Sequence, residues 1–450
     1  MKIKKYINHF QQSIGSLIIV IAILLGVYSN ADGAGQIQND SLSIDSVIRA
    51  VVSIHPQVQQ AEEALNAADA KIGLAKSGYF PTADITASYT LLYPVRSVSL
   101  VEGGPSFDMY PMNNYSTALN INQTIYAFGR NATRVQYEKE SKNLNEQSLE
   151  FIKQQLTMRT ISAYYVLIYL QEALKIADSQ LKNLQDHYDY VKKKQETGSA
   201  TSYEVLSTQV RISGIQSQIL DLQASRETTA SLLNLLMGKF ENAAIKLKKD
   251  IDINPYIETQ DSVIAEALRN RNEMLSALEK EKLSQMSIKI AKTEYYPSLH
   301  AFASGKFNNG NLDNLYKFEP NLVAGISLVV PIYEASRTKN NVSLANSAFL
   351  SSTYETESVR RRIIGEVVDY YQKETSAIKK IDQYQLQFEQ ASKAYDLALT
   401  SFNSGSITNL DLLDASNALG QNQLNLLKSK IDCLVSWYNL KIAIGVKLYE

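Results

Sequence analysis

The chain has 450 residues, a formal net charge of −1 and one cysteine. One cysteine excludes an internal disulfide and any metal site built from several cysteines. The near-neutral charge argues against a dedicated nucleic-acid-binding protein, which normally carries a basic surplus. Hydrophobic residues make up 45% and charged residues 20%, which is neither the composition of a disordered chain nor that of a multi-span helical membrane protein.

The first residues predict an export signal. Lys2, Lys4 and Lys5 precede an apolar run over 14–27, and a small, polar stretch follows that run. This order is typical of a secretory signal peptide. We therefore expect residues 1–31 to be a signal peptide that is cleaved after Ala31. A retained membrane anchor is the alternative, although the apolar run is short for a membrane span.

Short motifs recur along the chain at two constant spacings. The motif Tyr-Phe-Pro at 79–81 returns as Tyr-Tyr-Pro at 295–297, which is 216 residues later. The turn motif Gly-Ser-Ala-Thr at 198–201 returns as Gly-Ser-Ile-Thr at 405–408, which is 207 residues later. Such regular spacing indicates a tandem duplication. We expect one repeat at 32–250 and a second at 251–450.

Each repeat contains two segments with the period-two alternation of β-strands. These segments lie at about 82–93 and 114–126 in the first repeat, and at about 298–307 and 321–332 in the second. Their lengths suit strands that cross a bilayer in a tilted barrel; a small soluble β-sandwich is the alternative. Because about eight strands are needed to close a barrel, the membrane interpretation requires an oligomer, and a trimer would supply twelve strands.

The remaining segments predict helices of unusual length. Residues 131–197 include neither glycine nor proline, and one helix over this stretch would be ~100 Å long. Helices at about 41–79 and 202–238 accompany it in the first repeat. The second repeat has expected helices at about 259–295, 338–404 and 409–446. The turns at Gly198 and Gly405 then lie at the end of each helical hairpin that is remote from the strands.

These features resemble the TolC family of outer-membrane efflux ducts over about 41–448. The segments that carry the resemblance are the strand exits at 120–130 and 327–337 and the hairpin turns at 198–206 and 405–413. The resemblance implies a mainly α fold with a membrane β-barrel contribution, built from a duplicated helix-strand-strand-helix-helix unit. It implies a homotrimer with a 12-stranded outer-membrane barrel and a long α-helical tunnel in the periplasm. It also implies docking to a periplasmic adaptor (membrane fusion) protein and an inner-membrane pump.

Asp411 and Asp414 are the residues most expected to carry a function. They follow Gly405 by six and nine positions, as does the acidic pair at the tunnel entrance of that family. Residues at i and i+3 share one face of a helix, so threefold symmetry would stack two carboxylate rings that favour cations. The family's best-known closed gate uses Arg and Tyr where this chain has Ile407 and Phe402.

Helix capping is the local alternative for one of these aspartates. Thr408 and Asp411 have the spacing of a capping box, and Thr201 and Glu204 repeat it in the first half. We expect Glu204 to be a cap or gate residue.

Two further groups of residues complete the expected sites. The turns are expected to contact the adaptor through Gly198, Ser199, Gly405 and Ser406. The polar faces of the strands are expected to line the barrel lumen through Asp84, Thr86, Ser88, Asn120 and Asn122. A plain solvent-exposed face is the alternative for the strand residues.

The expected function is a passive exit duct of a tripartite efflux or secretion system. A stand-alone porin-like channel is the main alternative, but porins lack helices of ~100 Å. A structural or adaptor coiled coil is a third possibility, which the paired strands disfavour. The scattered histidines offer no metal or catalytic spacing, so we expect no enzyme activity, cofactor, metal or nucleic-acid partner.

Overall fold

A computed structural model describes residues 41–99, 101–249, 251, 258–311 and 313–449. The predicted signal peptide at 1–31 lies outside the described residues. Residues Leu42–Glu450 form one compact unit, to which all the helices and strands named below belong.

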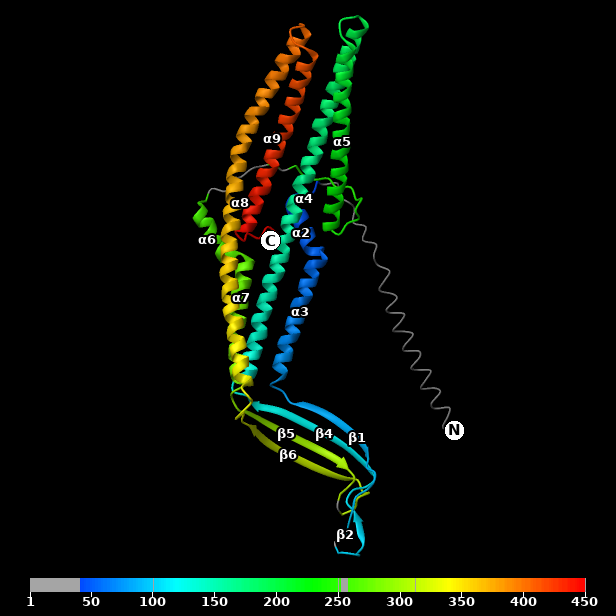
Figure 1. The fold of residues 1–450 in the computed structure, drawn as a ribbon, viewed down its shortest axis with the longest axis vertical. Helices are drawn as coiled ribbons and strands as arrows, with labels where there is room; N and C mark the ends of the chain where they lie inside the picture. The colour runs from blue at the N-terminus through cyan, green and yellow to red at the C-terminus, as the bar shows by residue number, and fades with distance from the viewer. Residues whose placement is uncertain (1–40, 100, 250, 252–257, 312, 450) are drawn as a thin grey trace, which may run out of the picture. The chain divides into compact units, whose positions relative to one another are not determined.

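Four long helices form two antiparallel hairpins (Figure 1). The first hairpin joins α4 (Arg130–Glu196) to α5 (Ser202–Leu236), and the second joins α8 (Arg337–Asn403) to α9 (Asn409–Ala443). Both α4 and α8 have 67 residues, so each is ~100 Å long. The two hairpins contact each other chiefly because α4 packs against α9 as well as against α5.

The expected helix at 41–79 is wrong as a single element. The structure has α2 (Ile44–Ile54) and α3 (Pro56–Ser77), with His55 in an extended conformation between them. Proline has no N–H to donate and excludes a helical residue before it, so it is tolerated only at a helix start. Pro56 therefore ends α2 and begins α3.

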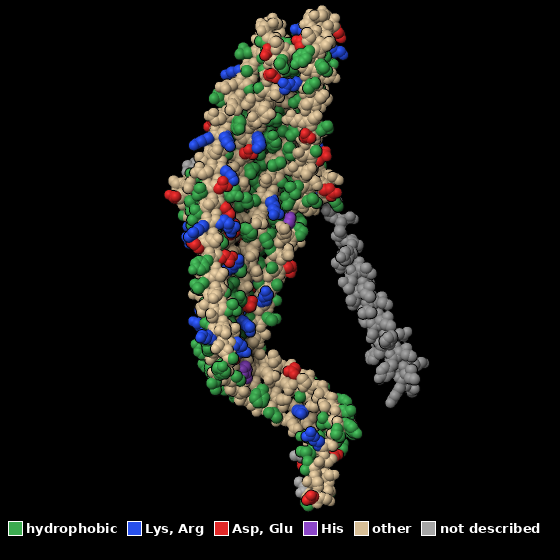
Figure 2. All heavy atoms as spheres, viewed as in Figure 1, with side chains coloured by type: hydrophobic (Ala, Val, Ile, Leu, Met, Phe, Trp, Pro, Cys, Tyr) green, Lys and Arg blue, Asp and Glu red, His purple; other side chains and the backbone are tan. Residues whose placement is uncertain are grey.

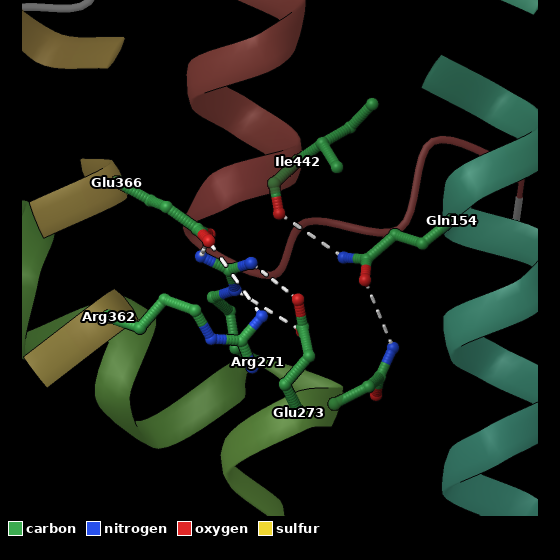
Figure 3. A network of polar contacts seen from close by, with 7 residues as sticks. Gln154, Arg271, Glu273, Arg362, Glu366 and Ile442 are labelled. Carbon is green, nitrogen blue, oxygen red and sulfur yellow. Dashed lines mark hydrogen bonds and ion pairs between the residues drawn. The ribbon is translucent and has the colours of Figure 1, made fainter. Parts of the chain in front are cut away.

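The expected helix at 259–295 is also broken, although no proline is present. It consists of α6 (Gln260–Asn270) and α7 (Asn272–Thr293), and Arg271 between them is extended with φ −67° and ψ 131°. The Arg271 guanidinium donates to Glu273 within α7 and, at 2.6 Å, to Glu366 of α8 (Figure 3). Because Arg271 is only 8% exposed, its charge depends on these two carboxylates: a buried charge left without a partner costs ~3–5 kcal/mol.

Amide side chains beside this ion network join the two halves of the chain. Gln154 of α4 donates to the backbone oxygen of Ile442 in α9 at 3.2 Å, and Asn272 of α7 donates to Gln154 at 3.4 Å (Figure 3). Gln154 and Asn272 are both buried. Buried amides are stable only when hydrogen-bonded, so these contacts fix the first half against the second.

The strands form one antiparallel sheet whose members come from both halves. Its order is β1 (Thr82–Leu91), β4 (Asn113–Tyr126), β5 (Ser298–Asn308) and β6 (Glu319–Val329). The segment between β1 and β4 contains a small hairpin of β2 (Ser97–Ser99) and β3 (Ser106–Asp108). β1 and β6 are the two edges of the sheet.

One face of this sheet is apolar and exposed. The strand register aligns Ile85, Leu119, Gly305 and Leu322 in a row across all four strands. Ile85 is 74% exposed and Leu322 is 80% exposed. On the face seen in Figure 2, few charged side chains lie over the sheet, whereas the helices carry many. An apolar surface of this kind marks an interaction with a membrane or a partner.

The largest hydrophobic core lies around the middle of α4. Its centre is made of the fully buried Ile161, Tyr164 and Ile168, against which α2 packs Val47 and Ile48. This core holds the start of the described chain in place, because the Tyr164 hydroxyl lies 2.9 Å from the backbone oxygen of Leu42. Within the part of the chain that the structure describes, none of the helices combines the length and the hydropathy of a membrane span.

Candidate functional site

The remote ends of the two hairpins are tight turns of the same construction. Gly198 has φ +77° and Gly405 has φ +78°, a left-handed conformation that glycine adopts without strain. The next residue closes each turn: the Ser199 amide donates to the Lys194 oxygen at 2.7 Å, and the Ser406 amide donates to the Ser401 oxygen at 2.8 Å. This is the hydrogen-bonding pattern of a Schellman cap, so the expected contact turns are short and rigid.

Each turn is followed by a helix with a complete capping box. At the start of α5, Glu204 accepts from the Thr201 amide at 2.6 Å, and Thr201 accepts from the Glu204 amide at 3.3 Å. At the start of α9, Asp411 accepts from the Thr408 amide at 2.9 Å, and Thr408 accepts from the Asp411 amide at 3.2 Å. Helix capping, the local alternative for Asp411 and for Glu204, is therefore present in the structure.

Capping does not remove the charge of Asp411. Hydrogen bonds from the Thr408 hydroxyl and amide lower the pKa of the Asp411 carboxyl. A carboxylate with a lowered pKa stays ionised at neutral and mildly acidic pH. Asp411 can therefore cap its helix and still contribute a negative charge to its surroundings.

The second aspartate of the pair has a partner that sequence reasoning missed. The Arg211 guanidinium of α5 donates to Asp414 of α9 at 2.7 Å; the Arg211 side chain is 39% exposed and the Asp414 side chain 60%. This ion pair joins the first hairpin to the second near their turns. No local signal in the sequence marks it, because the two residues are 203 positions apart.

Two more residues that sequence reasoning missed lie beside these groups. His187 of α4 and Asn409, the first residue of α9, are within hydrogen-bond distance across the hairpin boundary. Asn409 is only 2% exposed. In the sequence, Asn409 looks like an ordinary polar residue in the first turn of a helix.

The expected lumen residues share one face of the sheet, opposite to the apolar face. The register pairs Asp84 with Asn120 and Asn120 with Ser304. Asn120 donates to Asp84 at 3.0 Å and accepts from the Ser304 hydroxyl at 2.8 Å. Thr86 and Ser88 follow on β1, and Asn122 lies opposite Thr82. The result is a hydrogen-bonded polar row across three strands, with Ser304 as a member that the sequence did not single out.

The chemistry of these groups is that of ion pairs and hydrogen bonds. Over the described residues, no group of three or more His, Cys, Asp and Glu side chains could hold a metal ion. Cys433 is buried in α9, and burial raises the pKa of its thiol to about 11. A thiol with such a pKa is a poor nucleophile, since the thiolate is the reactive form.

Comparison with protein families gives one match that spans most of the chain. Residues 47–239 and 263–446 match the family described as outer membrane efflux protein. The two matched segments contain the two helical hairpins, α4 with α5 and α8 with α9.

Individual proteins give the same picture at low sequence identity. The alkaline protease secretion protein AprF of Pseudomonas aeruginosa is 25% identical over 347 residues, which is 74% of this chain and 70% of AprF. The outer membrane protein TolC of Vibrio cholerae is 22% identical over 397 residues, which is 87% of each chain. The crystal structure of the CmeC outer membrane channel of Campylobacter jejuni superposes with a TM-score of 0.75 at 18% identity, covering 89% of this chain and 85% of CmeC. This last likeness shows the fold.

Proposed function

Because this chain belongs to the outer membrane efflux protein family, we propose that it is the outer-membrane exit duct of a tripartite efflux or secretion system. It is an outer membrane protein. The duct is passive: an inner-membrane pump drives the cargo, and a periplasmic adaptor protein joins the pump to the duct. The observation that carries this proposal is the combination, in one chain, of an exposed apolar sheet face with two helical hairpins whose long arms, α4 and α8, are each ~100 Å long.

The sheet supports assembly as a homotrimer. Its edges, β1 and β6, have no partner within the described chain, and an unpaired strand edge does not occur in a bilayer. Four antiparallel strands leave β1 and β6 pointing in opposite directions, so β6 of one copy can pair antiparallel with β1 of the next. Three copies then make a barrel of twelve strands, which is large enough to enclose a lumen. The polar row of Asp84, Asn120 and Ser304 would face this lumen.

The hairpins would form the tunnel on the periplasmic side. Each trimer would contain two copies of the helix-strand-strand-helix-helix unit per chain, at 32–250 and 251–450. Asp411 and Asp414 would form two carboxylate rings near the end of the tunnel, and such rings favour cations. The Arg211 partner would offset part of the Asp414 charge. The proposed function requires no catalytic residue, cofactor or metal.

The turns at Gly198 and Gly405 would be the docking points for the adaptor. They are exposed and rigid, and they lie at the hairpin ends remote from the strands. A stand-alone porin-like channel requires only the membrane barrel and not these hairpins, so nothing in the structure favours that alternative.

In-cell cross-linking tests this proposal. Single cysteines at Ser199 and Ser406 would be cross-linked in the native cell envelope, and the products would be identified by mass spectrometry. We expect capture of a periplasmic adaptor protein from both positions. The matched control is a cysteine at Ser106, an exposed residue in the small hairpin between β1 and β4; we expect no adaptor from this position. Only self-adducts from Ser199 and Ser406, at normal expression, would exclude adaptor docking at the turns.

A further inference from the structure

A buried polar junction joins the two hairpins near their turns. The Asn409 side-chain oxygen of α9 lies 2.6 Å from Nε2 of His187 in α4. The Asn409 side-chain nitrogen lies 3.3 Å from the Glu204 backbone oxygen and 3.3 Å from the Thr208 hydroxyl, both in α5. Asn409 is 2% exposed and Thr208 is fully buried. One amide of the second hairpin therefore binds both helices of the first.

The network determines which nitrogen of His187 carries a proton. A backbone carbonyl only accepts hydrogen bonds, so the Asn409 NH₂ group must face Glu204. The Asn409 oxygen then faces His187, and Nε2 must donate to it. Neutral His187 is therefore protonated at Nε2, and Nδ1 is the atom that takes up a proton when the pH falls.

The surroundings of His187 disfavour the charged ring. The ring packs against Phe402 with centroids 5.2 Å apart, and Phe402 belongs to an apolar cluster with Val191 and Leu412. The Lys194 ammonium lies over the Phe402 ring, 5.0 Å from its centroid. Burial, with a smaller effect of the Lys194 charge, lowers the pKa of His187, and the hydrogen bond to Asn409 only partly opposes this.

Other titratable and charged groups lie around the junction on all four helices packed against it. On α4 and α8, His187 shares a cavity of about 440 Å³ with Asp186, Tyr190 and Tyr395. On α5 and α9, the Glu204 and Asp411 carboxylates are held in their own capping boxes, and Asp414 is paired with Arg211. Histidine is the side chain whose ordinary pKa, ~6.5, lies close to neutral pH, so His187 is the group in this junction suited to respond to mild acid.

We propose that the junction of His187, Asn409 and Thr208 is a latch that holds the two hairpins together, and that proton uptake by His187 releases it. Separation exposes the imidazolium to water and relieves its burial beside Lys194. That this separation widens a tunnel rests on the proposed function, whereas the latch itself is a property of one chain.

The direction of the pH effect follows from linkage. The pKa of His187 is lower with the hairpins together than with the ring in water, where it is ~6.5. The closed arrangement is therefore fully favoured above pH ~6.5 and loses stability as the pH falls toward the lowered pKa of the closed state. Between the two pKa values, the ratio of closed to open chains falls by up to about tenfold per pH unit.

Distance measurement between the turns tests the latch. Nitroxide labels at S199C and S406C in full-length protein in lipid nanodiscs would be measured by double electron–electron resonance at pH 7.5 and pH 5. Doubly labelled chains would be co-expressed with an excess of unlabelled chains, so that only distances within one chain are seen. The native Cys433 is buried with a raised pKa, so it does not compete for the label. We expect one short distance at pH 7.5 and a growing population of longer distances at pH 5.

Two substitutions of His187 separate a latch from a general effect of acid. His187→Gln keeps an N–H for Asn409 but cannot titrate, so we expect the short distance at both pH values. His187→Lys carries a permanent charge, so we expect long distances at both. The control His55→Gln alters a histidine at the junction of α2 and α3 and should leave the wild-type pH response unchanged. The latch would be overturned if the distance in the wild type is the same at both pH values, or if the pH response persists in His187→Gln.

These outcomes are independent of the proposed function. If the protein shows the predicted distances but captures no adaptor and conducts no ions, the latch is supported and the proposed duct function is wrong. If it conducts ions and captures an adaptor but its turns do not separate at pH 5, the duct function is supported and the latch is wrong.

Discussion

Glycine at a helix end can be required for two different physical reasons, and this chain contains both. Gly405, after α8, has φ +78°, and a Cβ atom there would meet only open space. Gly445, after α9, has φ +89°, and a Cβ atom there would lie 2.8 Å from the backbone of Asn270 at the end of α6. The first position needs only a left-handed residue, whereas the second also needs the absence of a side chain.

The two positions predict different losses on substitution by alanine. Gly405→Ala should cost about 1 kcal/mol, because a left-handed alanine is strained by roughly that amount. Gly445→Ala should cost about 3 kcal/mol, because the overpacking against Asn270 adds to the same strain. Thermal unfolding followed by helical circular dichroism would measure both losses. Equal losses would show that Asn270 moves away at no cost.

At the scale of the helices, the contact between α5 and α9 determines how much negative charge is left uncompensated at the surface near the turns. Asp411 remains ionised in its capping box, while Asp414 is paired with Arg211. An exposed ion pair of this kind contributes at most ~1 kcal/mol to stability. Its main effect is therefore electrostatic rather than structural.

Removal of Arg211 and removal of Asp414 should change block by cations in opposite directions. Arg211→Gln should leave Asp414 uncompensated and tighten block by a trivalent cation roughly tenfold, whereas Asp414→Asn should weaken it. Reconstituted channels in planar bilayers would give the blocking constant. Arg226→Gln is the control, because Arg226 lies on the same helix and is near Glu227 rather than Asp414. If the Arg211 and Arg226 variants behave alike, Asp414 does not face the permeating ions.

At the scale of the whole molecule, the two faces of the sheet differ in polarity. Alternate residues of β6 point to opposite faces: Ile326 lies on the apolar face, 69% exposed, and Ser327 lies on the polar face opposite His300. In the proposed barrel of three chains, the apolar face would meet lipid and the polar face would meet water.

A lysine scan of neighbouring positions tests this arrangement. Ile326→Lys should destabilise the proposed outer-membrane trimer by up to about 2–4 kcal/mol, which is what a lipid-facing lysine costs when it lies at the bilayer midplane. Ser327→Lys should be tolerated. The readout is the amount of heat-modifiable trimer in outer-membrane fractions. Equal tolerance of the two variants, or a monomer in those fractions, would contradict a barrel shared by three chains.

Local chemistry by itself determined much of this protein. A stretch without glycine or proline produces the 67-residue helix α4, Pro56 divides α2 from α3, and Thr408 with Asp411 caps α9. The two-residue alternation also determines that Asp84 and Asn120 share a face of the sheet. Each of these features depends on the intrinsic preferences of neighbouring residues, which a sequence displays directly.

Only the tertiary structure decided which distant groups meet. His187 and Asn409 are 222 positions apart, and Arg211 and Asp414 are 203 positions apart. Likewise, the break at Arg271 between α6 and α7 occurs without a proline, and the Arg271 guanidinium reaches Glu366 on another helix. Such contacts depend on how α4 packs against α9 and how α7 packs against α8. This packing is a collective result of whole helix faces, so it leaves no signal at the residues that it brings together.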